Sequence, residues 1–186
     1  TGVGVGLGTY TAGSIAMDGL LVVRPDGKLY VQSGIGNLGT GSVMDTARVV
    51  AEELAFPWDK IEVVWGDTSK HLPWSSPQAG SQTIHAHTRA NLAAAQDLKR
   101  KLQETAAVAL GGRPESYVVA NERVSSGGRS LTYAQAAAAA IKRGGRFDGH
   151  EMPQDINDMT KAAVTGLAGQ GLIGVARDNF GRKGST

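Results

Sequence analysis

The sequence contains no cysteine, and its composition points to no specialised class of protein. Disulfide bonds, thiolate nucleophiles and the usual cysteine-based zinc and iron–sulfur sites are therefore excluded from this chain. The formal net charge is only +2, so we expect no nucleic-acid partner. No apolar run approaches the roughly 20 residues of a membrane span, and we expect no direct membrane span. No charged and then apolar leader opens the chain, which leaves the compartment unknown.

The 186 residues suffice for a single domain with its own hydrophobic core. The chain opens on Thr1 and closes on Gly184-Ser185-Thr186 with no helix or strand pattern to finish it. We therefore expect a single domain over residues 1–186 that is a fragment of a larger subunit. Glycine is the abundant residue: the 26 glycines are about twice the average usage of roughly 7% and follow no collagen-like period.

The apolar periodicity predicts an α+β fold, in which a mixed β-sheet is covered by helices. Pro25-Asp26-Gly27 is a turn signal between two apolar stretches and predicts an antiparallel hairpin. A β-α-β unit is expected next, and the second helix should be the longer one. The predicted elements are strands near 20–23, 29–32 and 61–65, helices near 42–54 and 84–109, a hairpin at 117–125, a capped helix at 132–142, and broken helix and strand at 161–178.

The first residues alternate glycine with apolar side chains. In an extended chain Val3, Val5 and Leu7 would share one face, and the other face would be bare backbone. The glycine face allows another segment of backbone to approach closely.

The stretch from Gly34 to Gly39 reads G-x-G-x-x-G between a predicted strand and a predicted helix, as in dinucleotide-binding folds. The ribose-binding carboxylate of that motif should follow about 20 residues later. Asp67 comes 28 residues after Gly39, and the preceding strand is expected in a hairpin. A dinucleotide-binding α/β module that uses this loop is therefore the alternative, and a tight turn without any ligand is a third possibility.

The histidines give little support for a metal site or a hydrolase. His85 and His87 lie two residues apart, which on a helix points them about 200° from each other. We predict no metal ligands in this chain and expect its histidines to cap helices or lie at the surface. A triad of Ser81, His71 and Asp67 lacks the G-x-S-x-G elbow of hydrolases.

Two loops of small residues each open a predicted helix, and this pair is the more informative feature. Both loops offer hydroxyl groups and backbone N–H groups at positive helix ends, which suits an anionic or acceptor-rich ligand. If the two helix ends converge, they would hold one large ligand between them. The residues predicted to bind it are Gly39, Thr40, Gly41, Gln78, Ala79, Gly80, Ser81, Gln82 and Thr83.

Three blocks in order resemble a known family. "GIGNLGTGS", "DTARVVAEELAFPWDKIEVVWGDTSKHLPW" and "SSPQAGSQT" are similar to the molybdopterin-binding large subunit of the xanthine dehydrogenase and aldehyde oxidase family, the molybdenum hydroxylases. The resemblance covers residues 31–112, and "AGQGLIGVARDN" adds a weaker match. At the position of the glutamine in the family's G-Q-G loop stands Thr40, which is shorter and has no amide.

The resemblance implies part of an enzyme that hydroxylates an aldehyde or an N-heteroaromatic carbon with oxygen from water. It implies a molybdenum cofactor, as molybdopterin or its dinucleotide form, and iron–sulfur clusters on other domains or subunits. The implied partners are a small-molecule substrate, the remaining domains of the large subunit and an electron-transfer iron–sulfur subunit. No segment matches the context of the family's catalytic glutamate. We therefore expect no catalytic residue in this chain and no activity from the chain alone.

Overall fold

The computed structural model describes residues 1–9 and 15–178. Within them, a four-stranded sheet has the order β3-β2-β1-β7 and a three-stranded sheet the order β4-β5-β6. In the larger sheet β1 pairs antiparallel with β2 and with β7, whereas β2 and β3 run parallel. The sheet is mixed, as predicted. Its strands are β1 (Asp18–Val23), β2 (Leu29–Gln32), β3 (Ile61–Val64) and β7 (Leu172–Arg177).

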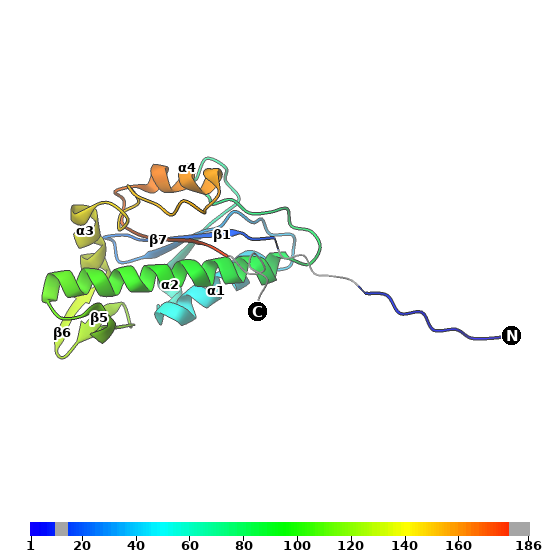
Figure 1. Ribbon diagram of the computed structural model, residues 1–186, viewed down its shortest axis with the longest axis horizontal. Coiled ribbons are helices and arrows are strands. Elements are labelled where there is room, and N and C mark those ends of the chain that lie inside the picture. The colour runs from blue at the N-terminus through cyan, green and yellow to red at the C-terminus, as the bar shows by residue number, and fades with distance from the viewer. Residues whose placement is uncertain (10–14, 179–186) are drawn as a thin grey trace.

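Helices cover both faces of this sheet (Figure 1). The long helix α2 and helix α1 lie on one face, and α4 lies on the other. Successive side chains of β1 alternate between the two cores: Leu21 and Val23 pack under α1 and α2, while Leu20 and Val22 pack under α4. The helices are α1 (Ser42–Leu54), α2 (Thr83–Leu110) and α4 (Asp158–Leu167).

The predicted elements are confirmed, with two differences. The β1–β2 hairpin turns at Gly27, whose φ of 82° needs the left-handed region, and β2-α1-β3 is the expected β-α-β unit. The sequence did not predict β6 (Arg129–Thr132), which extends the predicted hairpin of β4 (Val118–Ala120) and β5 (Arg123–Ser126). Helix α4 starts at Asp158, before the predicted residue 161. The expected irregular ending at Gly184-Ser185-Thr186 lies outside the described residues.

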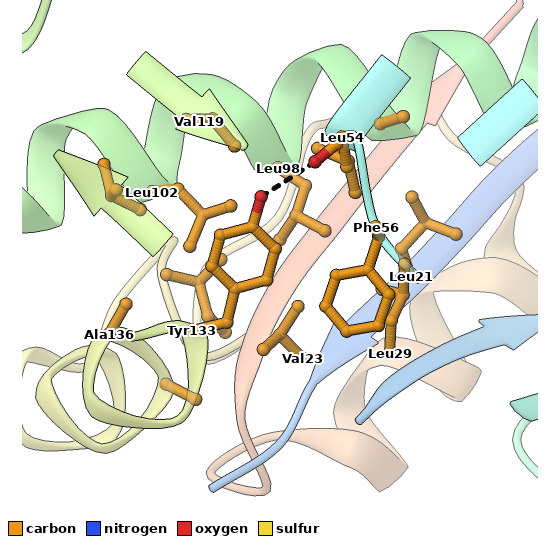
Figure 2. Close-up of a cluster of buried hydrophobic side chains, with 14 of the residues drawn as sticks. Leu21, Val23, Leu29, Leu54, Phe56, Leu98, Leu102, Val119, Tyr133 and Ala136 are labelled. Atoms are coloured by element: carbon orange, nitrogen blue, oxygen red, sulfur yellow. Dashed lines mark hydrogen bonds between the residues drawn. The ribbon is translucent and has the colours of Figure 1, made fainter. Parts of the chain in front are cut away.

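Helix α3 (Tyr133–Arg143) begins with the predicted capping box. The Thr132 hydroxyl accepts from the Gln135 amide, and the Gln135 side chain accepts from the Thr132 amide. The Tyr133 hydroxyl donates to the Leu54 carbonyl at the end of α1 over 2.9 Å, and its ring stacks on Phe56 at 5.3 Å (Figure 2). Both rings are buried in the same hydrophobic core as β1, β2 and α2. This contact therefore joins α3 and the second sheet to the core of the first sheet.

Side chains of α2 form hydrogen bonds with backbone groups on the outer edge of β7. Lys101 is 3% exposed, and its Nζ atom donates to the Ile173 carbonyl over 2.8 Å and pairs with Asp97 over 2.7 Å. Asp97 accepts in turn from the Val175 amide. Burial, the largest effect, lowers the pKa of Lys101, and the Asp97 carboxylate opposes that shift. This ion pair satisfies backbone groups that an edge strand would otherwise offer to another chain.

Candidate functional site

The glycine-rich loop that follows β2 is in close contact with the loop that precedes α2. A Cβ atom on Gly34 would lie 2.2 Å from the Pro73 carbonyl oxygen, so no side chain fits at this position. The Gly36 amide donates to Gln78 Oε1, and Gln78 Nε2 donates to the Gly36 carbonyl, each over 2.8 Å. Ser75 Oγ adds a bond to the Gly34 carbonyl over 2.8 Å. The first two glycines of the loop therefore accommodate the second loop.

The last two glycines of the same loop have a different role. Gly39 and Gly41 adopt φ values of 84° and 71°, which favour glycine. Their amides both donate to Asn37 Oδ1, over 3.0 and 3.3 Å. Asn37 Oδ1 therefore already accepts from the amide of Gly41, which is one of the residues predicted to bind the ligand. These glycines shape the turn that starts α1 at Ser42.

The second loop is held by a hydrogen bond within itself and by a contact with the body of the domain. Ser81 adopts a φ of 55°, which is sparsely populated for a residue with a side chain and is found preferentially at functional sites. Gln82 Nε2 donates to the Pro77 carbonyl over 2.7 Å and closes the loop on itself. Toward α4, the Trp74 amide donates to the Thr160 hydroxyl, which donates to the buried Asp18 carboxylate over 2.6 Å.

The two loops line one cavity of about 320 Å³. This volume lies at the lower end of the range for small-molecule sites. The helices α1 and α2 both begin at this cavity, with Ser42 and Thr83 as their first residues. Helix N-termini carry unpaired N–H groups and partial positive charge, so the cavity suits phosphate or other acceptor groups. Among the described residues its lining has no charged side chain and consists of Leu38, Thr40, Ser42, Gln78, Ala79, Ser81, Thr83 and Ile84.

The structure brings both predicted loops to this cavity but does not place every predicted residue on its wall. The predicted residues that line it are Thr40, Gln78, Ala79, Ser81 and Thr83. The predicted residues that do not line it are Gly39, Gly41, Gly80 and Gln82. The predicted binding residues did not include Leu38, Ser42 and Ile84, although Ser42 ends the first predicted loop and the other two directly adjoin the loops. Sequence reasoning also missed Asn37, whose position two residues before a glycine is a typical signal for a side chain that accepts from the turn.

A buried hydrogen bond joins the residue that follows β2 to the N-terminal part of α2. Ser33 Oγ and His87 Nε2 lie 3.1 Å apart, and both residues are buried. His87 Nδ1 has no partner in the described part of the chain. Our expectation of a surface or capping role is therefore wrong for His87, because α2 turns this side chain toward the sheet. Burial lowers the pKa of His87 to about 4, so the imidazole is neutral at pH 7.

Buried His87 predicts a pH dependence of stability. An unfolded histidine titrates near 6.5, whereas folded His87 titrates near 4, so the unfolded state alone gains a proton between these values. Stability should therefore fall as the pH drops from 6.5 to 4, by about 3 kcal/mol. Urea unfolding at several pH values checks this against His87→Gln, which lacks the titrating group. Parallel curves for the two proteins would contradict the prediction.

The other sites weighed from the sequence do not form. The Asp67 carboxylate accepts from the amide and hydroxyl of Ser69, and His71 packs against Gly166 of α4, whereas Ser81 lines the cavity. Among the described residues, no group of three histidine, aspartate or glutamate side chains could hold a metal ion. The described helices also include none with the length and apolar character of a membrane span.

The sheet differs from a dinucleotide-binding sheet. Among its described strands only β2 and β3 are parallel, and both partners of β1 run antiparallel to it. In the G-x-G-x-x-G motif of dinucleotide-binding folds the second glycine lets the backbone approach a pyrophosphate. Here the second glycine is Gly36, and the Gln78 side chain hydrogen-bonds to its backbone instead.

Comparison with known proteins agrees on a single family. Residues 1–169 match the family model described as the molybdopterin cofactor-binding domain. The chain is 33% identical over 116 residues to one subunit of nicotinate dehydrogenase from Pseudomonas putida, a match that covers 62% of this chain and 10% of that protein. It is 32% identical over 129 residues to the aldehyde oxidoreductase molybdenum-binding subunit PaoC of Escherichia coli, a match that covers 69% of this chain and 16% of that protein.

Solved structures show the same fold. The chain superposes on CO dehydrogenase from Oligotropha carboxidovorans with a TM-score of 0.62 and 21% identity, over 88% of this chain and 18% of that one. Quinoline 2-oxidoreductase from Pseudomonas putida 86 gives a TM-score of 0.53 at 17% identity, over 87% of this chain and 19% of that one. The chain thus spans between a tenth and a fifth of the length of these proteins.

Proposed function

The chain belongs to the family of molybdopterin cofactor-binding domains, and from this premise we propose that it forms one wall of the cofactor site in a larger molybdenum hydroxylase subunit. The observation that carries the proposal is the cavity between the two helix-opening loops. Both loops are among the blocks that resemble the family, and they meet in space although about 40 residues of chain separate them.

The groups at the cavity fit such a cofactor. The pterin ring of molybdopterin offers ring nitrogens and a carbonyl oxygen, and its side chain ends in a phosphate. Its site therefore needs hydrogen-bond donors more than charged side chains. The hydroxyls of Thr40, Ser42, Ser81 and Thr83 and the N-termini of α1 and α2 supply donors of this kind. Thr40 stands where the family has glutamine, and its hydroxyl donates to Ser42 Oγ over 3.2 Å. We infer that Gln78, held by Gly36, keeps the two walls at a fixed separation.

The proposed reaction is oxidation of an aldehyde or an N-heteroaromatic carbon with oxygen from water. The names of the two curated relatives, a nicotinate dehydrogenase and an aldehyde oxidoreductase, support one substrate class each. The cofactor supplies the redox centre when it is bound, and the residues of this chain hold and orient it. The catalytic glutamate, the substrate funnel and the iron–sulfur clusters would then be provided by other domains or subunits. The chain alone should be folded and inactive.

Metal and pterin analysis of the purified full-length protein tests this function. We expect close to one molybdenum per subunit, together with a pterin that is released on denaturation. Bound NAD or FAD without molybdenum would instead support the dinucleotide-binding alternative, and a protein with neither would indicate an interaction domain.

Gln78 provides a more local prediction. Gln78→Ala removes both 2.8 Å bonds to Gly36 and should leave the two loops less well fixed. At roughly 1 kcal/mol for each of the two bonds, the affinity for the cofactor should fall by up to about thirtyfold, and the molybdenum content under limiting cofactor should fall with it. Gln170→Ala also removes two side-chain hydrogen bonds, one from Arg24 and one to the Gly166 carbonyl, but Gln170 does not line the cavity. It is the matched control and should keep its molybdenum. Equal molybdenum in both variants would contradict the role of Gln78.

A further inference from the structure

Residues 1–9 form an extended segment that leads away from the body of the domain (Figure 1). Val3, Val5 and Leu7 are 97, 90 and 98% exposed. A Cβ atom built on any of the alternating glycines from Gly2 to Gly8 would meet no atom within 4 Å. The segment therefore exposes apolar side chains that a folded protein normally covers.

The pattern of this segment is that of a strand buried on both faces. In extended backbone the three apolar side chains lie on one face and the glycines on the other. Residues 2–8 include no charge and no proline, which are the devices that native edge strands use against pairing. A glycine face also allows a neighbouring backbone to approach closely.

The larger sheet of the described chain offers poor pairing for these residues. The outer side of β7 is already used, because the Ile173 amide donates to the Phe147 carbonyl while Lys101 and Asp97 bond Ile173 and Val175. The other edge, β3, has only four residues, which is shorter than the seven of Gly2 to Gly8.

We propose that residues 2–8 add as a strand to a β-sheet edge in the rest of the same polypeptide. The family model includes these residues, so the segment belongs to the domain rather than to a variable tail. The related proteins are at least five times longer than the matched region, so a strand from outside residues 1–186 is available in such a subunit. The inference rests on the proposed larger subunit but not on the identity of its cofactor.

The partner edge should carry an apolar surface that receives Val3, Val5 and Leu7. Its backbone groups would pair with those of the segment, so main-chain bonds supply the affinity and the alternate side chains supply the register. The glycine face would lie against another backbone or a flat helix surface.

Hydrogen exchange of the full-length protein tests the pairing. Amides between residues 2 and 8 should exchange at least about a hundredfold more slowly than in an unstructured peptide. Val5→Asp should abolish this protection, because it places a charge on the buried face, whereas Val5→Ile should retain it. Exchange at the unstructured rate in the wild-type protein would overturn the proposal.

A photo-crosslinking residue in place of Leu7 identifies the partner strand. The expected product is a crosslink to a peptide of the same polypeptide from outside residues 1–186. A crosslink to β3, or to a second copy in a mixture of isotope-labelled and unlabelled protein, would overturn the proposal. Molybdenum content measured on the same preparation reports on the proposed function separately, so the two failures are distinguishable.

Discussion

Gly34→Ala in the full-length protein is expected to lower molybdenum content about tenfold or more. The added Cβ atom would stand 2.2 Å from the Pro73 carbonyl oxygen, which belongs to the backbone of the second loop and cannot rotate away. Relief requires the loops to separate, at a cost of about 1 to 3 kcal/mol for an overpacked contact. That separation would widen the cavity whose two walls are proposed to hold the cofactor. Metal analysis of purified protein, with circular dichroism to confirm the fold, measures the effect.

Two other glycine substitutions serve as controls for Gly34→Ala. At Gly36 a Cβ atom would lie 3.3 Å from Gln78 Oε1, which is the end of a flexible side chain, so Gly36→Ala should have a smaller effect. Gly66 has a φ of 72° and open space around it, so Gly66→Ala strains the backbone outside the two loops. It should reduce stability but not the molybdenum bound per folded protein. Losses of molybdenum that follow stability alone across the three variants would contradict a specific effect at Gly34.

Lys101→Met is expected to destabilise the domain by about 3 kcal/mol, the cost of breaking a buried ion pair. The substitution leaves the Asp97 carboxylate without its closest partner and removes a bond to the Ile173 carbonyl on the edge of β7. Arg100→Ala is the matched control: Arg100 also approaches Asp97, at 3.5 Å, but its side chain is largely exposed. An exposed pair contributes at most about 1 kcal/mol, so this variant should remain close to the wild type.

Urea unfolding of the 186-residue chain measures both variants, and a rescue variant separates charge from packing. Asp97→Asn in the Lys101→Met background removes the unpaired charge, while the amide oxygen still accepts from the Val175 amide. This double variant should recover part of the lost stability. A Lys101→Met protein as stable as Arg100→Ala would show that the ion pair does not hold the sheet edge.

Much of the fold could be predicted because local patterns and tertiary packing agree. The apolar spacing of α1 and α2, the turn at Gly27 and the capping box at Thr132 each specify an element from a few neighbouring residues. The strand β6 was missed because its four residues are polar or half-buried and have no alternation to detect. Its pairing with β5 is what makes it a strand.

The site could be predicted to the level of its two loops but not to the role of each residue. Small residues before two helices indicated the cavity, but the sequence does not reveal which glycine meets a loop and which one turns the chain. Gly34 is required by a carbonyl 39 residues further along the chain, and Asn37 occupies the amides of Gly39 and Gly41. Such contacts depend on tertiary structure, as does the burial of His87 against Ser33.

An experimental structure of the full-length protein purified with its cofactor would show whether the cofactor binds between the two helix-opening loops. We expect pterin density in the cavity between the two loops, with a hydroxyl of Thr40, Ser42, Ser81 or Thr83 within hydrogen-bonding distance. Phosphate oxygens should lie near the first residues of α1 or α2. A cofactor bound elsewhere in the subunit, with this cavity filled by protein side chains, would contradict this expectation.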